Sequence, residues 1–357
     1  MKTIILTGGG TAGHVTPNLA LVSKLLEDGW DVKYIGSKNG IEKKLVEKAG
    51  IPFYGISSGK LRRYISKDNI TDMFKVVKGI GEATKLIAKL KPDVVFSKGG
   101  FVAVPVVLGA KLKGIPVVIH ESDITPGLAN KVTVPFAKAV CTTFPETGKY
   151  IKGTKTINTG TPIRSELFAG NKEAGLNICG FSEKKPVLLV MGGSLGAVKI
   201  NNCVREILEE ILLDFQVAHI CGKGNLDITR INVNGYKQFE YVLEELPDIL
   251  AAANIIVSRA GSNSISEFLV LKKPALLIPL SAKASRGDQI LNAESFKNRG
   301  FSAVLKEEDM SKKSLKEEID SLYKQREKYI EAMTENKNVN GDGINKVMKC
   351  IKEVANV

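Results

Sequence analysis

The sequence predicts an α/β protein with two doubly wound domains, each a parallel sheet covered by helices on both faces. Its 357 residues and 38.6 kDa exceed what one ordinary hydrophobic core supports. Short runs rich in Val and Ile alternate with helical stretches, which is typical of parallel strands buried on both faces. This rhythm begins twice, and each time the first strand runs into a glycine cluster.

The first half is expected to alternate strands and helices up to a loose connecting stretch. Helices are predicted from about Pro17 and near Glu42–Lys48. The predicted strands are TIILTG (3–8), DVKYIG (31–36), DVVFSKGG (93–100), PVVIHES (116–122) and AVCTTF (139–144). The stretch TGTPIRSELFAGNKEAG that follows places a domain boundary near Thr159–Ala169.

The second half repeats the pattern and closes with a charged segment. Its predicted strands are PVLLVMGGS (186–194), QVAHICG (216–222), NIIVSRAGS (254–262) and PALLIPL (274–280). One helix should run through about Leu213 and another to about Leu271, and Ser311 to Asn336 reads as a single solvated helix. We therefore expect domains at 1–160 and 161–336, followed by a C-terminal segment at 337–357.

Composition excludes several classes of protein. Hydrophobic residues at 43% and charged residues at 25% are globular averages, which argues against a disordered or disulfide-scaffold chain. No apolar run approaches the roughly 18 to 20 residues that span a bilayer, and MKTIILTGGG reaches glycine too early for a secretion signal. The five cysteines contain no CxxC pair, so we expect reduced, mostly buried thiols in a protein of the cytosol.

The positive charge is concentrated in one half of the chain. The net charge is +13, yet residues 1–160 hold 24 Lys and Arg against 12 Asp and Glu, whereas residues 161–357 hold 27 against 26. A one-sided positive field attracts a polyanion or an anionic membrane surface. General solubility explains the charge equally well when the charge is considered alone.

The first glycine cluster, Gly8–Gly13, lies where open α/β sheets bind ligands, beyond the carboxyl end of a strand. It fits GxGxxG, but Gly36 and Ser37 occupy the strand end where a dinucleotide site needs an acidic residue, so a structural tight turn is the better alternative. His14 follows directly at a helix start, which favours a neutral imidazole able to accept a proton. His14 is thus a candidate general base, or else a histidine that only caps or packs on the loop.

Two further clusters in the first half end neighbouring strands. Ser97–Phe101 ends one strand, and His120–Asp123 ends the next. Because a glutamate beside a histidine can orient it or raise its basicity, the pair His120 and Glu121 competes with His14 for the role of base. A purely structural hydrogen-bonded pair is an equally good interpretation.

The second half carries groups suited to a nucleotide sugar. Gly192–Ser194 leads into a helix whose first turn could receive a diphosphate, or it is a plain turn. A carboxylate at Glu267 can accept both ribose hydroxyls, or it is an ordinary favourable charge near a helix start. The polar residues around these positions are Arg259, Ser262 and Asn263 in SRAGSNSISE, and Arg286, Asp288, Gln289 and Asn292 in RGDQILNA.

Missing motifs narrow the chemistry. The sequence has no DxD triplet and no His/Cys/Asp cluster with metal spacing, so we expect no metal and no cofactor. Helix N-termini and arginine would then stabilise a departing diphosphate. It also has no GxxxxGK[ST], which argues against a P-loop kinase.

Taken in order, GGGTAGHVTPNLA, SKGGFVAVP, HESD, GTPIR, GGSLGA, SRAGSNSISE and RGDQILNA resemble the signatures of the MurG family, the peptidoglycan N-acetylglucosaminyltransferases. The resemblance covers essentially the whole chain. It implies the GT-B fold, in which two Rossmann-like domains face each other across a cleft and C-terminal residues cross back to the first domain. It also implies transfer of GlcNAc from UDP-GlcNAc to the MurNAc 4-hydroxyl of the undecaprenyl-linked acceptor lipid I, with inversion, to give lipid II.

The resemblance assigns roles position by position. It implies His14 or Glu121 as the catalytic base, with no metal and no nucleic-acid partner. Asp288 and Asp123 stand where family members commonly have amides, so these two side chains accept but do not donate hydrogen bonds. The implied acceptor-binding residues are Thr11, Ala12, Gly13, Gly99, Gly100 and Asp123. The implied donor-binding residues are Arg164, Ser194, Val242, Arg259, Ser262, Asn263, Glu267, Asp288 and Gln289.

The resemblance also gives the basic half a role at a membrane. In NITDMFKVVKGIGEATKLIAKL, apolar residues at helical spacing lie beside lysines, so this helix could dip into an anionic lipid surface. The implied location is the cytoplasmic face of the cell membrane, with other cell-wall synthesis proteins as possible partners. Without the resemblance, a stripe that packs on its own sheet would be preferred. The stripe residues are Ile70, Met73, Phe74, Val77 and Ile80.

Other functions remain open from the sequence. Another GT-B enzyme, such as a glycolipid glucosyltransferase or a UDP-GlcNAc epimerase, is the nearest alternative. A non-catalytic module that binds a nucleotide sugar or a membrane is a different class, which the polar loop ends disfavour. NAD-dependent oxidoreduction is the most distant alternative.

Overall fold

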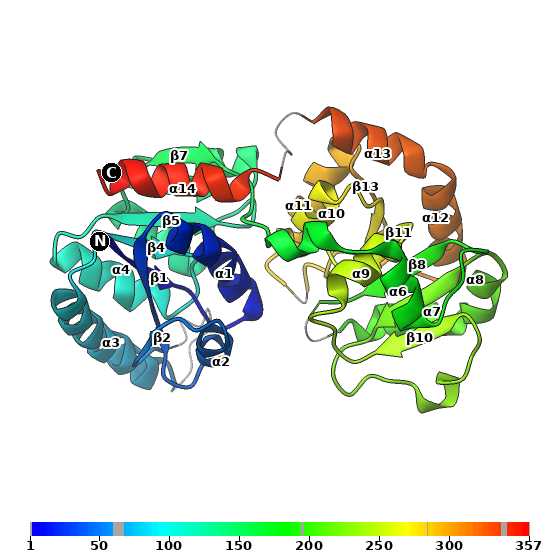
Figure 1. Cartoon of the computed structure of the whole chain (residues 1–357), viewed down its shortest axis with the longest axis horizontal. Coiled ribbons are helices and arrows are strands. Elements are labelled where there is room, and N and C mark those ends of the chain that lie inside the picture. The colour runs from blue at the N-terminus through cyan, green and yellow to red at the C-terminus, as the bar shows by residue number, and fades with distance from the viewer. Residues whose placement is uncertain (1, 60–67, 194–195, 284, 337–340, 357) are drawn as a thin grey trace. The chain divides into compact units, whose positions relative to one another are not determined.

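The computed structural model describes residues 2–59, 68–193, 196–283, 285–336 and 341–356. The chain forms two compact units (Figure 1). The first comprises Met1–Arg164 together with Gly341–Val357, and the second comprises Ser165–Asn340. Each unit is built on one parallel sheet, as the apolar runs of the sequence predict.

The first unit contains a seven-stranded sheet in the order β3-β2-β1-β4-β5-β6-β7. Its strands are β1 (Lys2–Thr7), β2 (Trp30–Ser37), β3 (Phe53–Ile56), β4 (Val94–Ser97), β5 (Val117–Glu121), β6 (Ala139–Thr142) and β7 (Lys155–Asn158). Its helices are α1 (Ala12–Glu27), α2 (Ile41–Lys48), α3 (Asp68–Leu90), α4 (Ala103–Leu112), α5 (Leu128–Thr133) and α14 (Gly343–Val354), with short 3₁₀ turns η1 (Val134–Phe136) and η2 (Pro145–Tyr150).

The second unit contains a six-stranded sheet in the order β10-β9-β8-β11-β12-β13. Its strands are β8 (Val187–Met191), β9 (Gln216–Ile220), β10 (Tyr236–Phe239), β11 (Ile255–Ser258), β12 (Ala275–Leu277) and β13 (Ser302–Val304). Its helices are α6 (Lys172–Cys179), α7 (Val198–Glu206), α8 (Leu208–Asp214), α9 (Leu246–Ala252), α10 (Ser262–Val270), α11 (Asp288–Asn298), α12 (Lys312–Lys324) and α13 (Arg326–Glu335), with η3 (Ser165–Ala169) and η4 (Ile228–Arg230).

Alternation along β1 divides the core of the first unit between the two faces of its sheet. Ile4 and Leu6 pack with α1 and α14, whereas Ile5 packs with α3 and α4. In Figure 1, α14 (red) lies beside the strands of this unit although it closes the chain. Its contribution is apolar, because Val347, Met348, Cys350 and Ile351 are all buried in the core cluster that contains α1.

Some expected element bounds were wrong. The first helix begins at Ala12 and contains Pro17 rather than starting there. The helix expected through Leu213 breaks at Ile207 into α7 and α8, and the solvated helix expected at Ser311–Asn336 breaks at Gln325 into α12 and α13. One face of α12 is core rather than solvated, because Leu315, Ile319 and Leu322 are buried. The short strands β3, β7, β10 and β13 were not predicted.

Two expectations about the chain as a whole can be compared with the structure. All five cysteines are free and buried, as their spacing predicts. Within the described ranges, no helix is both long enough and apolar enough to cross a bilayer.

Candidate functional site

In both units, the strand order reverses where the glycine-rich loops leave the sheet. The reversal lies between β1 and β4 in the first unit and between β8 and β11 in the second. Ligands of open α/β sheets bind beyond the carboxyl ends of the strands at such a reversal. The loops after β1 and β4, and those after β8 and β11, are therefore the candidate sites of their respective units.

The two glycine loops of the first unit pack directly on each other. A Cβ added to Gly100 would lie 2.2 Å from the carbonyl oxygen of Gly9, so only glycine permits this approach. The carbonyl of Gly8 accepts a hydrogen bond from the Tyr34 hydroxyl at 2.7 Å, and Asn18 Nδ2 donates to the carbonyl of Thr7 at 3.1 Å. The first loop is thus held by buried side chains of α1 and β2.

His14, the third residue of α1, lies against this loop. Its Nδ1 is 3.1 Å from the carbonyl oxygen of Gly9 and 3.2 Å from Thr11 Oγ1. Because a carbonyl oxygen can only accept, Nδ1 carries the hydrogen in this contact. The lone pair of the neutral ring then lies on Nε2, which is the arrangement that a general base requires.

His120 is arranged in the opposite way and is unsuited to be a base. Lys98 Nζ donates to its Nδ1 at 2.9 Å, and its Nε2 lies 2.9 Å from the carbonyl oxygen of Gly160, so both ring nitrogens are engaged. Burial, reinforced by the charge of Lys98, lowers the pKa of His120 well below its usual value. This residue therefore stays neutral and links β5 to the segment after β7.

Glu121, the other candidate base, holds its own loop. Its two oxygens accept hydrogen bonds from the backbone N–H of Asp123 at 2.9 Å, from that of Gly127 at 3.0 Å and from Asn130 Nδ2 at 2.8 Å. The side chain is buried, and burial followed by the charge of Asp123 raises its pKa. With three donors directed at the carboxylate, Glu121 fixes the turn into α5 and is less suited than His14 to act as the base.

A cavity of about 570 Å³ opens beside the first glycine loop. It extends from Gly10 past hydroxyl groups at the ends of β2 and β3 to the side of α3. Its lining includes Gly10, Ser37, Lys38, Ser57, Lys75 and Phe101. The cavity thus joins the loop that holds His14 to a helix with exposed apolar side chains, because Met73 is 63%, Phe74 72% and Val77 63% exposed.

The exposure of these side chains decides between the two interpretations of the apolar stripe on α3. Packing of Met73, Phe74 and Val77 on their own sheet is excluded, whereas Ile80 is half-buried. The side chain of Ile70 lies outside the described residues. The buried side of α3 uses other residues, Ala83 and Ile87, which face the cluster containing α4.

In the second unit, the loops after β11 and β12 are bound to each other. Arg259 donates to the carbonyl of Ile278 at 3.2 Å and pairs with the buried carboxylate of Glu307. Asn292 Nδ2 reaches the carbonyl of Ala260 at 3.3 Å. Arg259 thus cross-links three strand ends, which is a structural task that the sequence did not indicate for it.

The other expected donor residues fall into three groups. Ser262, Asn263 and Glu267 lie on α10, and Asp288 and Gln289 begin α11 after the neighbouring strand β12, so the fold brings these five to one sheet edge. Asp288 pairs with Arg286 at 2.5 Å, and Gln289 Oε1 accepts from the backbone of Leu280 at 3.0 Å. Val242 is buried and lies after the edge strand β10, away from α10 and α11 in the strand order. Arg164 belongs to the first unit. Ser194 lies outside the described residues.

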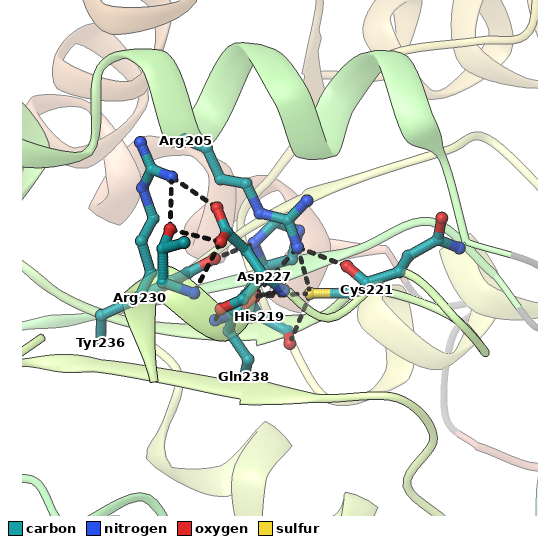
Figure 2. Close-up of polar contacts among 9 residues, drawn as sticks. Arg205, His219, Cys221, Asp227, Arg230, Tyr236 and Gln238 are labelled. Carbon is teal, nitrogen blue, oxygen red and sulfur yellow. Dashed lines mark hydrogen bonds and ion pairs between the residues drawn. The ribbon is translucent and has the colours of Figure 1, made fainter. Parts of the chain in front are cut away.

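A polar network joins α7 to β9, β10 and the segment between them (Figure 2). Arg205 on α7 donates to Gln238 Oε1 at 2.9 Å and contacts Cys221 Sγ at 3.4 Å. The ring of His219 lies 2.9 Å from the Tyr236 hydroxyl. A Cβ on Gly196 would lie 2.1 Å from the carbonyl oxygen of Cys221, so the network fixes the strand end on which this glycine loop rests.

Within the part of the chain that the structure describes, no cluster of three or more His, Cys, Asp or Glu side chains is placed to hold a metal ion. The described loops of both units instead offer backbone N–H groups, hydroxyls, amides and arginines. These are groups that recognise phosphates and sugar hydroxyls.

Comparison with known proteins agrees with this chemistry. The model of the glycosyltransferase family 28 N-terminal domain matches residues 4–142, and that of the C-terminal domain matches residues 187–350. A UDP-N-acetylglucosamine–N-acetylmuramyl-(pentapeptide) pyrophosphoryl-undecaprenol N-acetylglucosamine transferase of Clostridium tetani is 61% identical over 340 residues, 95% of each chain. The enzyme of that name from Clostridium perfringens is 57% identical over 354 residues, 99% of each chain. This chain belongs to the MurG family.

A solved MurG structure shows the same architecture. The crystal structure of Acinetobacter baumannii MurG superposes with a TM-score of 0.77 at 25% identity, covering 99% of this chain and 100% of that one. The fold is therefore of the GT-B type, as the resemblance in the sequence implied.

Three buried residues that the sequence did not single out contact the candidate site residues or their loops. Lys98 and Asn130 are buried and support His120 and Glu121. Glu42 is fully buried beside the first glycine loop. A glutamate at the start of an amphipathic helix looks like a solvated helix-start charge, so only its burial could have distinguished it.

Proposed function

We propose that this protein transfers N-acetylglucosamine from UDP-N-acetylglucosamine to the 4-hydroxyl of the N-acetylmuramyl group of lipid I, which forms lipid II with inversion at the sugar carbon. The observation that carries the proposal is the 61% identity, over 95% of both chains, to the transferase of Clostridium tetani. The arrangement of the loops in each unit is compatible with this chemistry.

The acceptor is assigned to the first unit. His14 Nε2 takes the proton of the acceptor hydroxyl, the oxygen bonds to the sugar carbon, and the bond from that carbon to the diphosphate of UDP breaks. The Nδ1 contact to Gly9 supports this role, because it keeps the lone pair on Nε2. The cavity from Gly10 to Lys75 supports an approach of the acceptor from the side of α3.

The donor is assigned to the second unit, and no metal is required. Support comes from the N-terminus of α10, where no side chain caps the helix, and from the polar residues at the start of α11. Backbone N–H groups at helix starts stabilise phosphate charge. Arg164, which the resemblance assigns to the nucleotide, belongs to the first unit, and its buried Nε finds no hydrogen-bond partner among the described residues.

The site of action is proposed to be the cytoplasmic face of the cell membrane. The exposed residues Met73, Phe74 and Val77 on α3 would enter the lipid interface, and Lys75 and Lys78 beside them would face anionic headgroups. The surplus of positive charge within residues 1–160 adds to the attraction.

One incubation tests the proposal. Purified protein receives labelled UDP-N-acetylglucosamine and a short-chain lipid I analogue, with and without EDTA, and the products are identified by mass spectrometry. We expect the disaccharide product at similar rates in both samples. Conversion of the donor in the absence of acceptor would identify an epimerase instead, and no sugar transfer to the analogue would contradict the proposal.

A further inference from the structure

A buried carboxylate accepts a hydrogen bond from the first glycine loop. Glu42, the second residue of α2, is fully buried. Its Oε2 accepts a hydrogen bond from the backbone N–H of Gly10 at 3.2 Å, and its Oε1 accepts one from the backbone N–H of Ser37 at 2.8 Å and one from the Ser37 hydroxyl. One side chain of α2 therefore connects the end of β2 to the loop after β1.

The backbone around this carboxylate is made of glycine for a steric reason. A Cβ on Gly9, Gly36 or Gly40 would lie between 2.3 and 2.9 Å from atoms of the Glu42 side chain. Real Cβ atoms do not approach so closely, so three segments leave room for the same carboxylate. A surface charge that merely favours a helix start would not be enclosed in this way.

The same peptide group contacts both Glu42 and His14. The N–H that Glu42 binds belongs to Gly10, and the carbonyl that His14 Nδ1 contacts belongs to Gly9, so both atoms are part of the single peptide unit between these residues. Because a peptide unit is planar and rigid, its N–H and C=O turn together. Gly10 adopts a φ of +85°, a conformation that glycine accepts without strain, so the unit can take the orientation in which both hydrogen bonds form.

We propose that Glu42 is a positioning residue for the general base, acting on His14 through the Gly9–Gly10 peptide group. The inference rests on the proposed function only for its effect on the rate, because the positioning itself is a property of the free protein. The carboxylate orients the peptide so that the Gly9 carbonyl receives Nδ1–H, and this contact holds the lone pair on Nε2.

The charge of Glu42 has an effect in addition to orienting the Gly9–Gly10 peptide group. A carboxylate that accepts from the N–H of a peptide polarises the unit and strengthens its carbonyl as an acceptor. The carbonyl in turn stabilises the positive charge that the imidazole gains when it takes a proton. An aspartate that contacts a catalytic histidine directly has the same effect in hydrolases. Here no proton crosses the peptide, and no covalent bond changes.

Glu42→Gln is the decisive variant because it keeps the size of the side chain. The two backbone N–H groups are bound to different oxygens, and glutamine has only one. One of the two N–H groups must then face the NH₂ group of glutamine. The variant therefore loses its hydrogen bond either to Gly10 in the loop or to Ser37 at the end of β2. The matched control is Glu47→Gln, on the same helix but with its side chain 53% exposed.

We expect kcat of Glu42→Gln to fall about 10- to 100-fold, the range that a misplaced catalytic group produces, with donor KM and UDP affinity changed less than about twofold. A second readout needs no activity. The chain has three histidines, so ¹⁵N spectra of the imidazoles can be assigned by single substitutions. In the wild type, His14 should be the Nδ1–H tautomer, and Glu42→Gln should move it toward Nε2–H while the signals of His219 stay in place.

Each alternative outcome has a defined meaning. A folded Glu42→Gln with wild-type kcat and unchanged His14 signals overturns the inference, as does an Nε2–H tautomer of His14 in the wild type. If Glu42→Gln does not fold, Glu42→Asp replaces it, because the shorter carboxylate keeps its charge but withdraws from Gly10, and the same tautomer shift is expected. Absence of transferase activity in the wild type would refute the proposed function and leave the tautomer measurement to decide on Glu42.

Discussion

Lys98 Nζ donates a hydrogen bond to Nδ1 of His120 at 2.9 Å, and both side chains are buried. Lys98 also donates to the Ser122 hydroxyl, so one ammonium group joins the loop after β4 to the loop after β5. Enclosing this cation disfavours its charged form. Burial lowers the pKa of Lys98 to about 8, although the charges of Glu121 and Asp123 oppose the shift.

The first prediction follows from that pKa. An unfolded lysine titrates near 10.5, so between pH 8 and 10.5 the unfolded chain binds more protons at this residue than the folded protein does, and the contribution of Lys98 to stability rises with pH. The gain due to Lys98 is on the order of 3 kcal/mol at 1.36 kcal/mol per pKa unit. We expect urea unfolding of Lys98→Met to lack this rise. Because Lys273 also has a pKa of about 8, the difference between variant and wild type is the quantity to measure.

The second prediction concerns the base. His14→Ala should lower kcat by about 10² to 10⁴, the usual contribution of general-base catalysis. UDP affinity, measured by calorimetry, should stay unchanged because the expected nucleotide contacts lie largely in the other unit. Glu121→Gln is the companion variant. Wild-type turnover in His14→Ala together with inactive Glu121→Gln would move the role of base to Glu121.

The third prediction concerns the membrane surface. Phe74→Ala combined with Val77→Ala should weaken binding to anionic vesicles by about 10- to 100-fold, because several buried methylene groups are lost at about 0.8 kcal/mol each and interfacial burial is only partial. Thermal stability should be unchanged, since both side chains are exposed. Leu213→Ala is the control, because Leu213 is 74% exposed but lies on α8 of the second unit. Equal vesicle binding by the double variant and wild type would remove α3 from the interface.

The fourth prediction concerns the bracing of the donor loops. Burial would raise the pKa of Glu307, but the hydrogen bond and charge of Arg259 and the charge of Lys199 outweigh it, so the pKa is lowered. Glu307→Gln should therefore cost about 1 to 3 kcal/mol of stability at neutral pH. A lowered pKa means that this contribution is present above the unfolded value of about 4.5 and is lost as the pH falls below it.

The control and a functional readout accompany that variant. Glu308→Gln changes the exposed neighbour and should leave unfolding unaffected. Arg259, once released from Glu307, no longer holds the ends of β11 and β12 together, so the KM for the donor should rise in Glu307→Gln alone. A pH-independent difference from wild type would show that the carboxylate is not paired as described.

The sequence predicted the fold well where strands are fully apolar and helices amphipathic. β1, β4, β5, β8 and β11 were found because residues buried on both faces form continuous Val and Ile runs. The edge strands β3, β7, β10 and β13 were missed, since short strands with one partner carry mixed residues such as KTIN in β7. The break at Gln325 was also missed because nothing in the helical spacing marks it.

The candidate site was less predictable, for a different physical reason. Motif positions made His14 and the glycine loops candidates, but sequence does not show which atoms are already engaged in hydrogen bonds. The competition between His14 and His120 could be judged only from their partners, a carbonyl on Nδ1 in one case and an ammonium in the other. Likewise, Glu42 and Lys98 look like ordinary charged residues until their burial is known.

The position of α14 has a consequence for how the chain becomes a folded protein. Val347 and Ile351 complete a core whose other members, such as Leu6 and Leu25, are made at the beginning of synthesis. During translation, α1 can cover part of that face early, but the cover is completed only when α14 emerges after the whole second unit. Termination before Val347 would remove the core side chains of α14 and leave apolar surface open on the unit that contains His14, although every residue of that glycine loop would already be present.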